Sequence, residues 1–238
     1  MSGHSKWSKV KHQKATTDAV KSASFTRASR GITVAVKEGG GIGDPDKNFR
    51  LRLAIEFARS VNMPKDNIER AIERAKGSES GTLDTVVYEG YGPGGVAVLV
   101  LAATDNHQRT SANVKHQFDR SGGSIASPGA VGYLFQKRGI LLLEKTGTSF
   151  DAVLDAAITA GADDVVEKDD VFEVYTKATD LFSVKTALSP TFTITHAALI
   201  MHPSLLVPVS EDIRAKIEEL VETLESNEDV LEVYTNME

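Results

Sequence analysis

The chain of 238 residues has the apolar and charged content of an ordinary folded protein, 41% and 25%, which excludes wholesale disorder and allows two or three small domains. It contains no cysteine, which excludes disulfides, thiolate metal sites and cysteine nucleophiles and fits a reducing cytoplasm. Residues 1–80 hold 16 lysines and arginines against 9 acidic residues, a net charge of +7, whereas residues 81–238 hold 11 against 24, a net charge of −13. A basic head on an acidic body attracts polyanions to one end of the chain.

The first fifteen residues form a basic arm without an apolar period or the apolar segment of a secretory signal. Lysines recur every two or three residues around Trp7. Lysine neutralises phosphates, and tryptophan can stack on an unpaired base. The alternative is a solvated tail whose tryptophan packs against the following helix. We predict that the arm contacts nucleic acid through Lys6, Trp7, Lys9, Lys11, His12 and Lys14.

Three helices are predicted in the rest of the first 80 residues. In the first, from about Thr17, an apolar face that includes Ile32 lies opposite a basic face, and it ends at the glycines of residues 39–41. The second, from about Asp46 to Val61, has apolar residues spread widely around it, as in a central buried helix. The third opens at residues 62–64 with a proline and ends at Gly77. On the first helix, the predicted nucleic-acid contacts are Arg27, Arg30 and Lys37.

After Gly81 the pattern changes to strands, with one helix among them. Strands are predicted at residues 86–88, 96–101 and 131–135, and a helix at residues 105–121. One face of this helix carries cations and a histidine, which makes it either a solvated face or a secondary nucleic-acid surface. The secondary candidates are Arg109, His116 and Arg120.

Residues 138–202 have the element order β-α-β-β-α-β, which is that of a ferredoxin-like domain. The tail is then predicted to form a strand, a helix and a strand, at residues 205–209, 211–224 and 230–234. This tail lacks enough partners to fold alone, so we expect it to complete the set that begins at residue 81. The predicted fold is therefore α+β and multi-domain: an N-terminal three-helix domain followed by two α/β domains, one inserted in the other. The expected boundaries are 1–80, 81–137 with 203–238, and the inserted 138–202.

Patterns for catalysis are weak. Neither glycine-rich stretch has the spacing of a phosphate-binding loop, and the six histidines do not have a metalloprotease spacing. The stretch Gly90–Gly95 lies between two predicted strands, where a hairpin connection explains it. The acidic pairs at residues 163–164 and 169–170 are typical of turns. We predict no enzyme, no cofactor and no metal, and keep an enzyme that holds a nucleotide on Gly90–Gly95 as the less favoured alternative.

Several motifs together closely resemble the YebC/PmpR family, which includes the mitochondrial translational activator of cytochrome oxidase subunit one. They are GHSKW at 3–7, KH at 11–12, ITVAVKEGGG at 32–41, LRLAIEFA at 51–58, NMPKDNIERAI at 62–72 and YEGYGPGGVAV at 88–98. The resemblance covers essentially the whole chain. It implies three domains, the third inserted in the second, and a cytoplasmic protein that is either a DNA-binding transcriptional regulator or a ribosome-associated factor that assists translation.

We therefore predict a cytoplasmic DNA-binding regulator of transcription without catalytic activity and without a membrane segment. The main alternative is a translation factor or translational activator that binds ribosomal RNA and the ribosome, because a flexible basic arm with an aromatic residue suits irregular RNA as well as duplex DNA. No helix-turn-helix pattern is recognisable, so modest sequence specificity is expected.

Overall fold

The computed structural model describes residues 18–77 and 83–238, and the chain divides into two compact units. The first unit takes the described residues up to Leu134 together with Leu205–Glu238, and the second is Phe135–Ser204. The predicted insertion at residues 138–202 lies within the second unit. In the part of the chain that the structure describes, no helix combines the length and the apolar character needed to cross a membrane.

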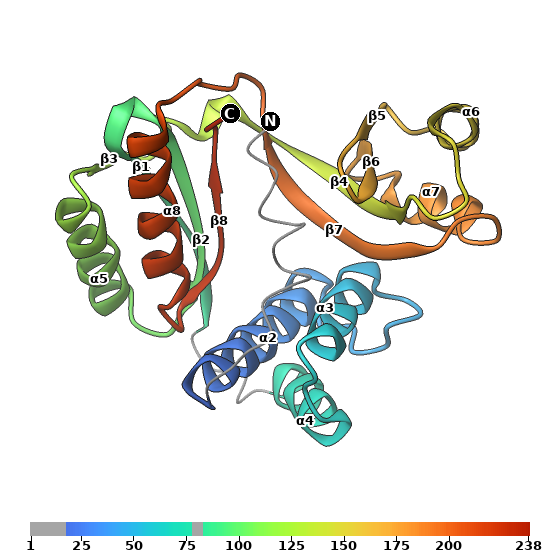
Figure 1. Ribbon diagram of the computed structural model, residues 1–238. Coiled ribbons are helices and arrows are strands. Elements are labelled where there is room, and N and C mark those ends of the chain that lie inside the picture. Colours follow the sequence, from blue (N-terminus) through green and yellow to red (C-terminus); the bar gives the residue numbers. More distant parts are fainter. Residues whose placement is uncertain (1–17, 78–82) are drawn as a thin grey trace. The chain divides into compact units, whose positions relative to one another are not determined.

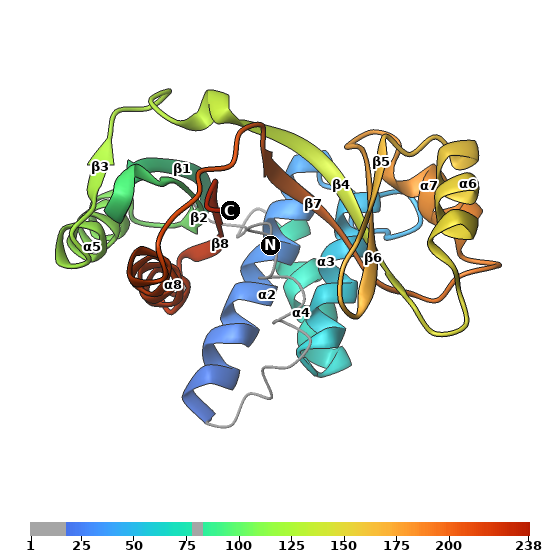
Figure 2. The ribbon, with the colours of Figure 1, turned by 45° about the horizontal axis from the view of Figure 1, so that its top comes forward.

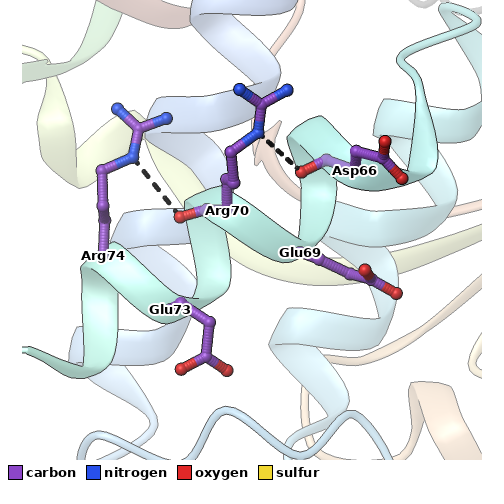
Figure 3. Close-up of a pocket in the computed structure, with 5 residues that line it drawn as sticks. All are labelled: Asp66, Glu69, Arg70, Glu73 and Arg74. Carbon is purple, nitrogen blue, oxygen red and sulfur yellow. Dashed lines mark hydrogen bonds between the residues drawn. The ribbon is translucent and has the colours of Figure 1, made fainter.

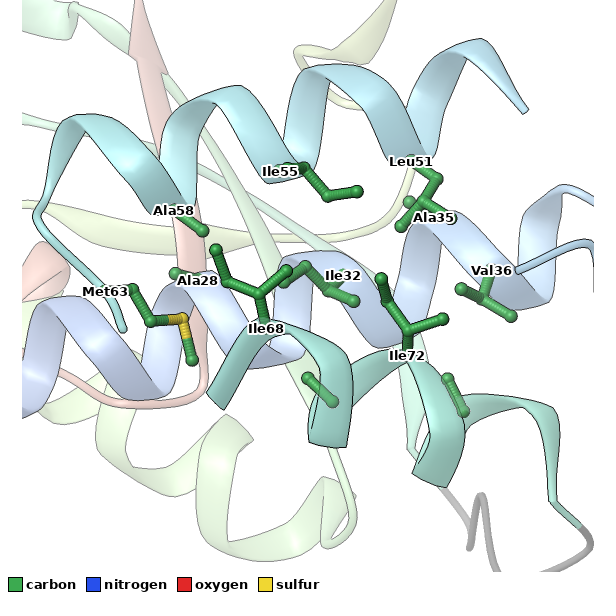
Figure 4. Packing of buried hydrophobic residues seen from close by; sticks show 12 residues of the cluster. Ala28, Ile32, Ala35, Val36, Leu51, Ile55, Ala58, Met63, Ile68 and Ile72 are labelled. Atoms are coloured by element: carbon green, nitrogen blue, oxygen red, sulfur yellow. The ribbon is translucent and has the colours of Figure 1, made fainter. Parts of the chain in front are cut away.

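The first unit begins with helices α2 (Asp18–Glu38), α3 (Phe49–Ser60) and α4 (Lys65–Lys76). Each carries apolar residues at helical spacing, and these meet in one buried core (Figure 4). The first helix, α2, contacts both of the others and is the central one. The expectation that the second helix is central was wrong, because α3 leaves Phe49 and Phe57 partly exposed. The core side chains are Ala28, Ile32, Ala35, Val36, Leu51, Ile55, Ala58, Met63, Ile68, Ala71, Ile72 and Ala75.

The turn between α2 and α3 depends on Asn48. Its side chain caps α3 by accepting a hydrogen bond from the Leu51 amide at 3.1 Å, and it donates to the carbonyl oxygens of Ala35 and Ile42, both at 2.9 Å. A Cβ atom on Gly39 would lie 2.2 Å from the amide nitrogen of the Asn48 side chain. Gly39, the first glycine after α2, is therefore required because the Asn48 side chain lies too close to its backbone for a Cβ atom to fit.

The sheet of the first unit, called the middle sheet below, has four antiparallel strands in the order β3-β1-β2-β8 (Figure 1). Their bounds are β1 (Asp84–Tyr91), β2 (Ala97–Thr104), β3 (Ser124–Ala126) and β8 (Val230–Thr235). Helices α5 (His107–Arg120) and α8 (Glu211–Glu225) pack on one face, where Val98 and Val100 of β2 meet Phe118 and Leu220. Strand β8 completes a sheet begun by residues 84–104, as the element count predicts.

The second unit is a ferredoxin-like fold whose strands follow the order β5-β6-β4-β7, all antiparallel. Helices α6 and α7 lie together on one side of the sheet (Figure 2). Leu181 of α7 approaches Gly139, where an added Cβ would lie 2.8 Å from that leucine's own Cβ. The elements are β4 (Phe135–Glu144), α6 (Phe150–Ala160), β5 (Asp164–Glu167), β6 (Val171–Lys177), α7 (Leu181–Leu188) and β7 (Ile194–Pro203).

Three local expectations differ from the structure. The predicted strand at 131–135 is a short 3₁₀ turn, Gly132–Leu134, followed by the single long strand β4. The predicted strand at 205–209 is an irregular segment with one isolated bridge, Val207 to Met237. Strand β3 was missed because it has only three residues, too few for an alternating pattern to show.

Candidate nucleic-acid interface

The predicted arm lies outside the described residues. Its candidates Lys6, Trp7, Lys9, Lys11, His12 and Lys14 fall in residues 1–17. Their contact with nucleic acid stays a prediction, which rests on residue type and spacing.

The predicted contacts on α2 are engaged within the first unit. Arg27 donates to the carbonyl oxygen of Glu225, and the Lys37 ammonium donates to that of Leu83 at 3.1 Å. Arg30 reaches the carbonyl oxygen of Ala103 at 2.6 Å. The sequence pattern correctly identifies a polar face opposite the helical core, but this face bonds to the middle sheet, its flanking loops and α8. These bonds give the three cations a structural role within the first unit, and their contact with a phosphate stays a prediction.

The centre of this contact is Asp229, whose side chain is only 4% exposed. One carboxylate oxygen pairs with Arg30 at 2.7 Å, and the other accepts from Arg109 at 2.8 Å and from the Thr110 hydroxyl at 2.6 Å. The Asp229 carbonyl oxygen accepts the amide of Ala103 at 2.8 Å. One buried carboxylate therefore ties α2, the start of α5 and the start of β8 together, and its charge is compensated as burial demands.

Of the secondary candidates on α5, all three are exposed, and Arg109 also belongs to this network. Arg109 also pairs with Asp105 at 2.7 Å, and that hydrogen bond lowers the pKa of Asp105. Two carboxylates thus compensate the guanidinium of Arg109. The three residues therefore share an exposed helix face as predicted, and at one end of it Arg109 also has a structural role.

Most described cations of the helical region, which comprises α2, α3, α4 and their connections, have a carboxylate partner. Lys47 lies 3.6 Å from Asp44, Lys65 lies 3.4 Å from Glu69, and Lys76 lies 2.7 Å from Glu73. Arg50 pairs with Glu38, and Arg52 lies 3.8 Å from Asp46 while also donating to the Pro45 carbonyl oxygen.

Within described residues 22–77, three exposed arginines have no carboxylate within ion-pair distance: Arg59, Arg70 and Arg74. The last two are four residues apart on α4. This pair was not among the residues predicted from the sequence, although its position opposite the apolar stripe Ile68–Ile72 was the available signal.

The glycine stretch at residues 90–95 is a hairpin connection, as predicted. It joins antiparallel β1 and β2, and the Gly92 amide donates to the Val96 carbonyl oxygen at 2.8 Å. A Cβ on Gly92 would lie 2.4 Å from Cδ1 of Ile217, and one on Gly94 would lie 2.8 Å from Ile213. These glycines allow α8 to pack against the turn, which gives them a structural role.

Glu89 on β1 organises the segment that leads to the second unit. Its carboxylate accepts hydrogen bonds from the backbone amides of Gly129, Val131 and Gly132, all at 2.7 Å. Burial alone would raise the pKa of Glu89, but the three amides outweigh burial and lower it. The carboxylate therefore holds residues 129–132 in place as an anion.

The second unit contains a separate titratable cluster. The Tyr175 hydroxyl donates to Glu173 at 2.8 Å, and the tyrosine ring packs edge-on against His202 at 4.9 Å. Burial raises the pKa of Glu173 and lowers that of His202. Across residues 18–77 and 83–238, no group of three or more histidine or acidic side chains is placed to hold a metal ion.

Comparison with known proteins matches the chain to models of successive domains of one family. Residues 5–78 match the family described as "TACO1/YebC protein N-terminal domain", and residues 83–237 match "TACO1/YebC second and third domain". A protein of Shewanella oneidensis named "Probable transcriptional regulatory protein" is 46% identical, with 100% of this chain and 96% of that protein covered. A protein of the same name from Latilactobacillus sakei is 43% identical, with coverage of 99% and 97%.

A solved structure has the same fold. The crystal structure of a conserved hypothetical protein from Aquifex aeolicus aligns with a TM-score of 0.86 and 39% identity, and covers 98% of this chain and 96% of that one. The similarity therefore extends over both compact units.

Proposed function

Since this chain belongs to the TACO1/YebC family, we propose that it is a cytoplasmic regulator of gene expression that binds DNA and catalyses no reaction. Relatives of more than 40% identity that carry the name "Probable transcriptional regulatory protein" support the regulatory role. DNA as the ligand is our inference from the charge of the chain.

The observation that carries the proposal is the segregation of charge. The first 37 residues hold eight basic residues and one acid, and the rest of the chain is strongly acidic. Lysine contacts to phosphates release counterions and supply affinity without reading the base sequence. An acidic body repels a polyanion, so binding is directed to the basic end.

Modest sequence specificity is expected. Bases are read by side chains of a helix or ribbon that enters a groove. The two short helices α3 and α4 both turn their apolar stripes toward α2, and Arg27, Arg30 and Lys37 of α2 bond within the unit. Affinity would therefore come mainly from backbone phosphates.

The alternative function is a translation factor that binds ribosomal RNA. It is favoured by Trp7 standing among the lysines of the arm, because stacking on unpaired bases is the usual mode of recognising loops and single strands. The same basic arm would supply the phosphate contacts.

Charge-removal variants test the proposal. The variant Lys6→Ala/Lys9→Ala/Lys11→Ala/Lys14→Ala removes four charges from the arm. A matched control removes four exposed lysines from the acidic part, Lys115→Ala/Lys137→Ala/Lys177→Ala/Lys216→Ala. Fluorescence anisotropy with duplex DNA and with structured RNA measures affinity against salt concentration. The arm variant should lose about 0.9 units of log–log salt slope for each phosphate contact to duplex DNA that it removes, and the control should lose little. Full affinity of the arm variant for both polynucleotides would refute the proposal.

Three further measurements separate DNA from RNA and test the absence of catalysis. A footprint at defined promoters that resists competition by bulk RNA supports the DNA reading. Sedimentation with ribosomes that is lost at high salt supports the translation factor. Nucleotide turnover that disappears in Gly92→Ala, in a variant shown to be folded, would instead support an enzyme.

A further inference from the structure

Helix α4 presents two arginines side by side on its solvent face. Arg70 and Arg74 are one helical turn apart, and Figure 3 shows their guanidinium groups directed to the same side of the helix. The stripe of Ile68, Ala71 and Ile72 packs into the helical core. The core therefore fixes the rotation of α4 and holds the arginine side outward.

The helix itself orients both side chains. Arg70 donates from Nε to the Asp66 carbonyl oxygen at 3.1 Å and from Nη2 to Asn67 Oδ1 at 2.6 Å. Arg74 donates from Nε to the Arg70 carbonyl oxygen at 3.4 Å. A guanidinium has five N–H donors, so these bonds leave several donors of each group directed to solvent. Side chains held in this way lose less rotamer entropy when a ligand binds.

The carboxylates nearby do not neutralise the pair. Glu69 pairs with Lys65 and Glu73 pairs with Lys76, and Figure 3 shows both glutamates directed away from the guanidinium groups. Glu69 and Glu73, together with Asp66, line a shallow depression along α4 that Arg70 and Arg74 also line. Within described residues 22–77, Asp66 has no cation within ion-pair distance, so it is the one carboxylate that opposes an anion here.

We propose that Arg70 and Arg74 form a phosphate clamp, a second contact through which the helical region binds the backbone of a nucleic acid. The inference rests on the proposed function, because it assumes that the ligand is a polynucleotide. The planar guanidinium fork matches two phosphate oxygens at once. Two such forks on one helix turn fit two phosphates of the same backbone, whereas lysines of the arm act as point charges.

The test compares the full chain with Arg70→Gln/Arg74→Gln. Glutamine is a good helix former, and both positions are exposed, so circular dichroism and the unfolding midpoint should stay unchanged. Binding to duplex DNA is measured by anisotropy between about 50 and 200 mM salt. Loss of two phosphate contacts should lower the log–log salt slope by about 2 units. The same titration with an RNA hairpin shows which polynucleotide uses the clamp.

Two single variants complete the design. Arg59→Gln removes an exposed arginine of α3 that also lacks a carboxylate partner, and it should leave the slope unchanged. Asp66→Asn removes the opposing carboxylate and should strengthen binding. An unchanged slope in the double variant, or an equal fall in Arg59→Gln, would overturn the clamp while leaving the proposed function intact. Absence of salt-dependent binding by the unmodified chain to either polynucleotide would overturn both.

Discussion

Replacing Asp229 tests how firmly the helices are joined to the middle sheet. The substitution Asp229→Ala removes a carboxylate that is 4% exposed and leaves Arg30, whose side chain is 18% exposed, without its ion pair. Arg30 keeps the Ala103 carbonyl oxygen, and Thr110 keeps Thr104 and the Asn106 carbonyl oxygen. Breaking a buried ion pair costs about 3–5 kcal/mol when nothing replaces it. With these remaining partners, we expect about 2–3 kcal/mol of the free energy of unfolding to be lost.

Urea denaturation measures this loss, and a thermal scan should show a midpoint lowered by roughly 4–12 °C for a unit of this size. The matched control is Asp105→Ala, which removes the exposed partner of Arg109 and should leave the midpoint almost unchanged. A double-mutant cycle with Arg30→Ala should be strongly non-additive, because the two side chains share one interaction. Additive effects, or a stable Asp229→Ala protein, would show that this carboxylate does not join α2 to the sheet.

Three further outcomes follow from the packing of single residues. Three hydrogen bonds from backbone amides lower the pKa of Glu89. The stabilising effect of the Glu89 carboxylate is therefore complete above the ordinary glutamate pKa of about 4.3 and is lost as the pH falls through the lowered pKa. Urea titrations should show that Glu89→Gln is less stable than the unmodified chain near neutral pH, and that the difference vanishes in acid. Gly92→Ala forces a methyl group against Ile217 and should cost about 1–3 kcal/mol by the same titration. Ile32→Ala empties the centre of the helical core, where Ile32 is 0% exposed, and should cost about 2–5 kcal/mol, with loss of helical circular dichroism at a lower temperature.

Much of the fold could be predicted because helices and strands leave periodic patterns in the chain. The three N-terminal helices, the Gly90–Gly95 hairpin and the β-α-β-β-α-β order of residues 138–202 are all confirmed by the structure. Short or irregular segments could not be predicted. Strand β3 has three residues, and residues 205–209 are apolar without forming a strand. Local pattern cannot distinguish such cases, because pairing with a neighbouring strand decides them.

The candidate site was harder to predict than the fold. Arg30 and Arg70 are both arginines opposite an apolar stripe, and nothing in the local sequence separates them. Arg30 meets Asp229 from the far end of the chain, whereas Arg70 meets only its own helix. Whether an arginine is available to bind a ligand therefore depends on the folded structure and cannot be read from the local sequence.

The amino-acid sequence by itself determined the helices, the inserted ferredoxin-like unit and the separation of a basic end from an acidic body, because periodicity and charge are local or additive quantities. Only the tertiary structure decided which cations face solvent. It placed Asp229 beside Arg30 and Arg109, and it left the guanidinium groups of Arg70 and Arg74 exposed on α4. The physical reason is that a buried carboxylate must be compensated by whatever cation the fold brings within hydrogen-bonding distance, at any separation along the chain.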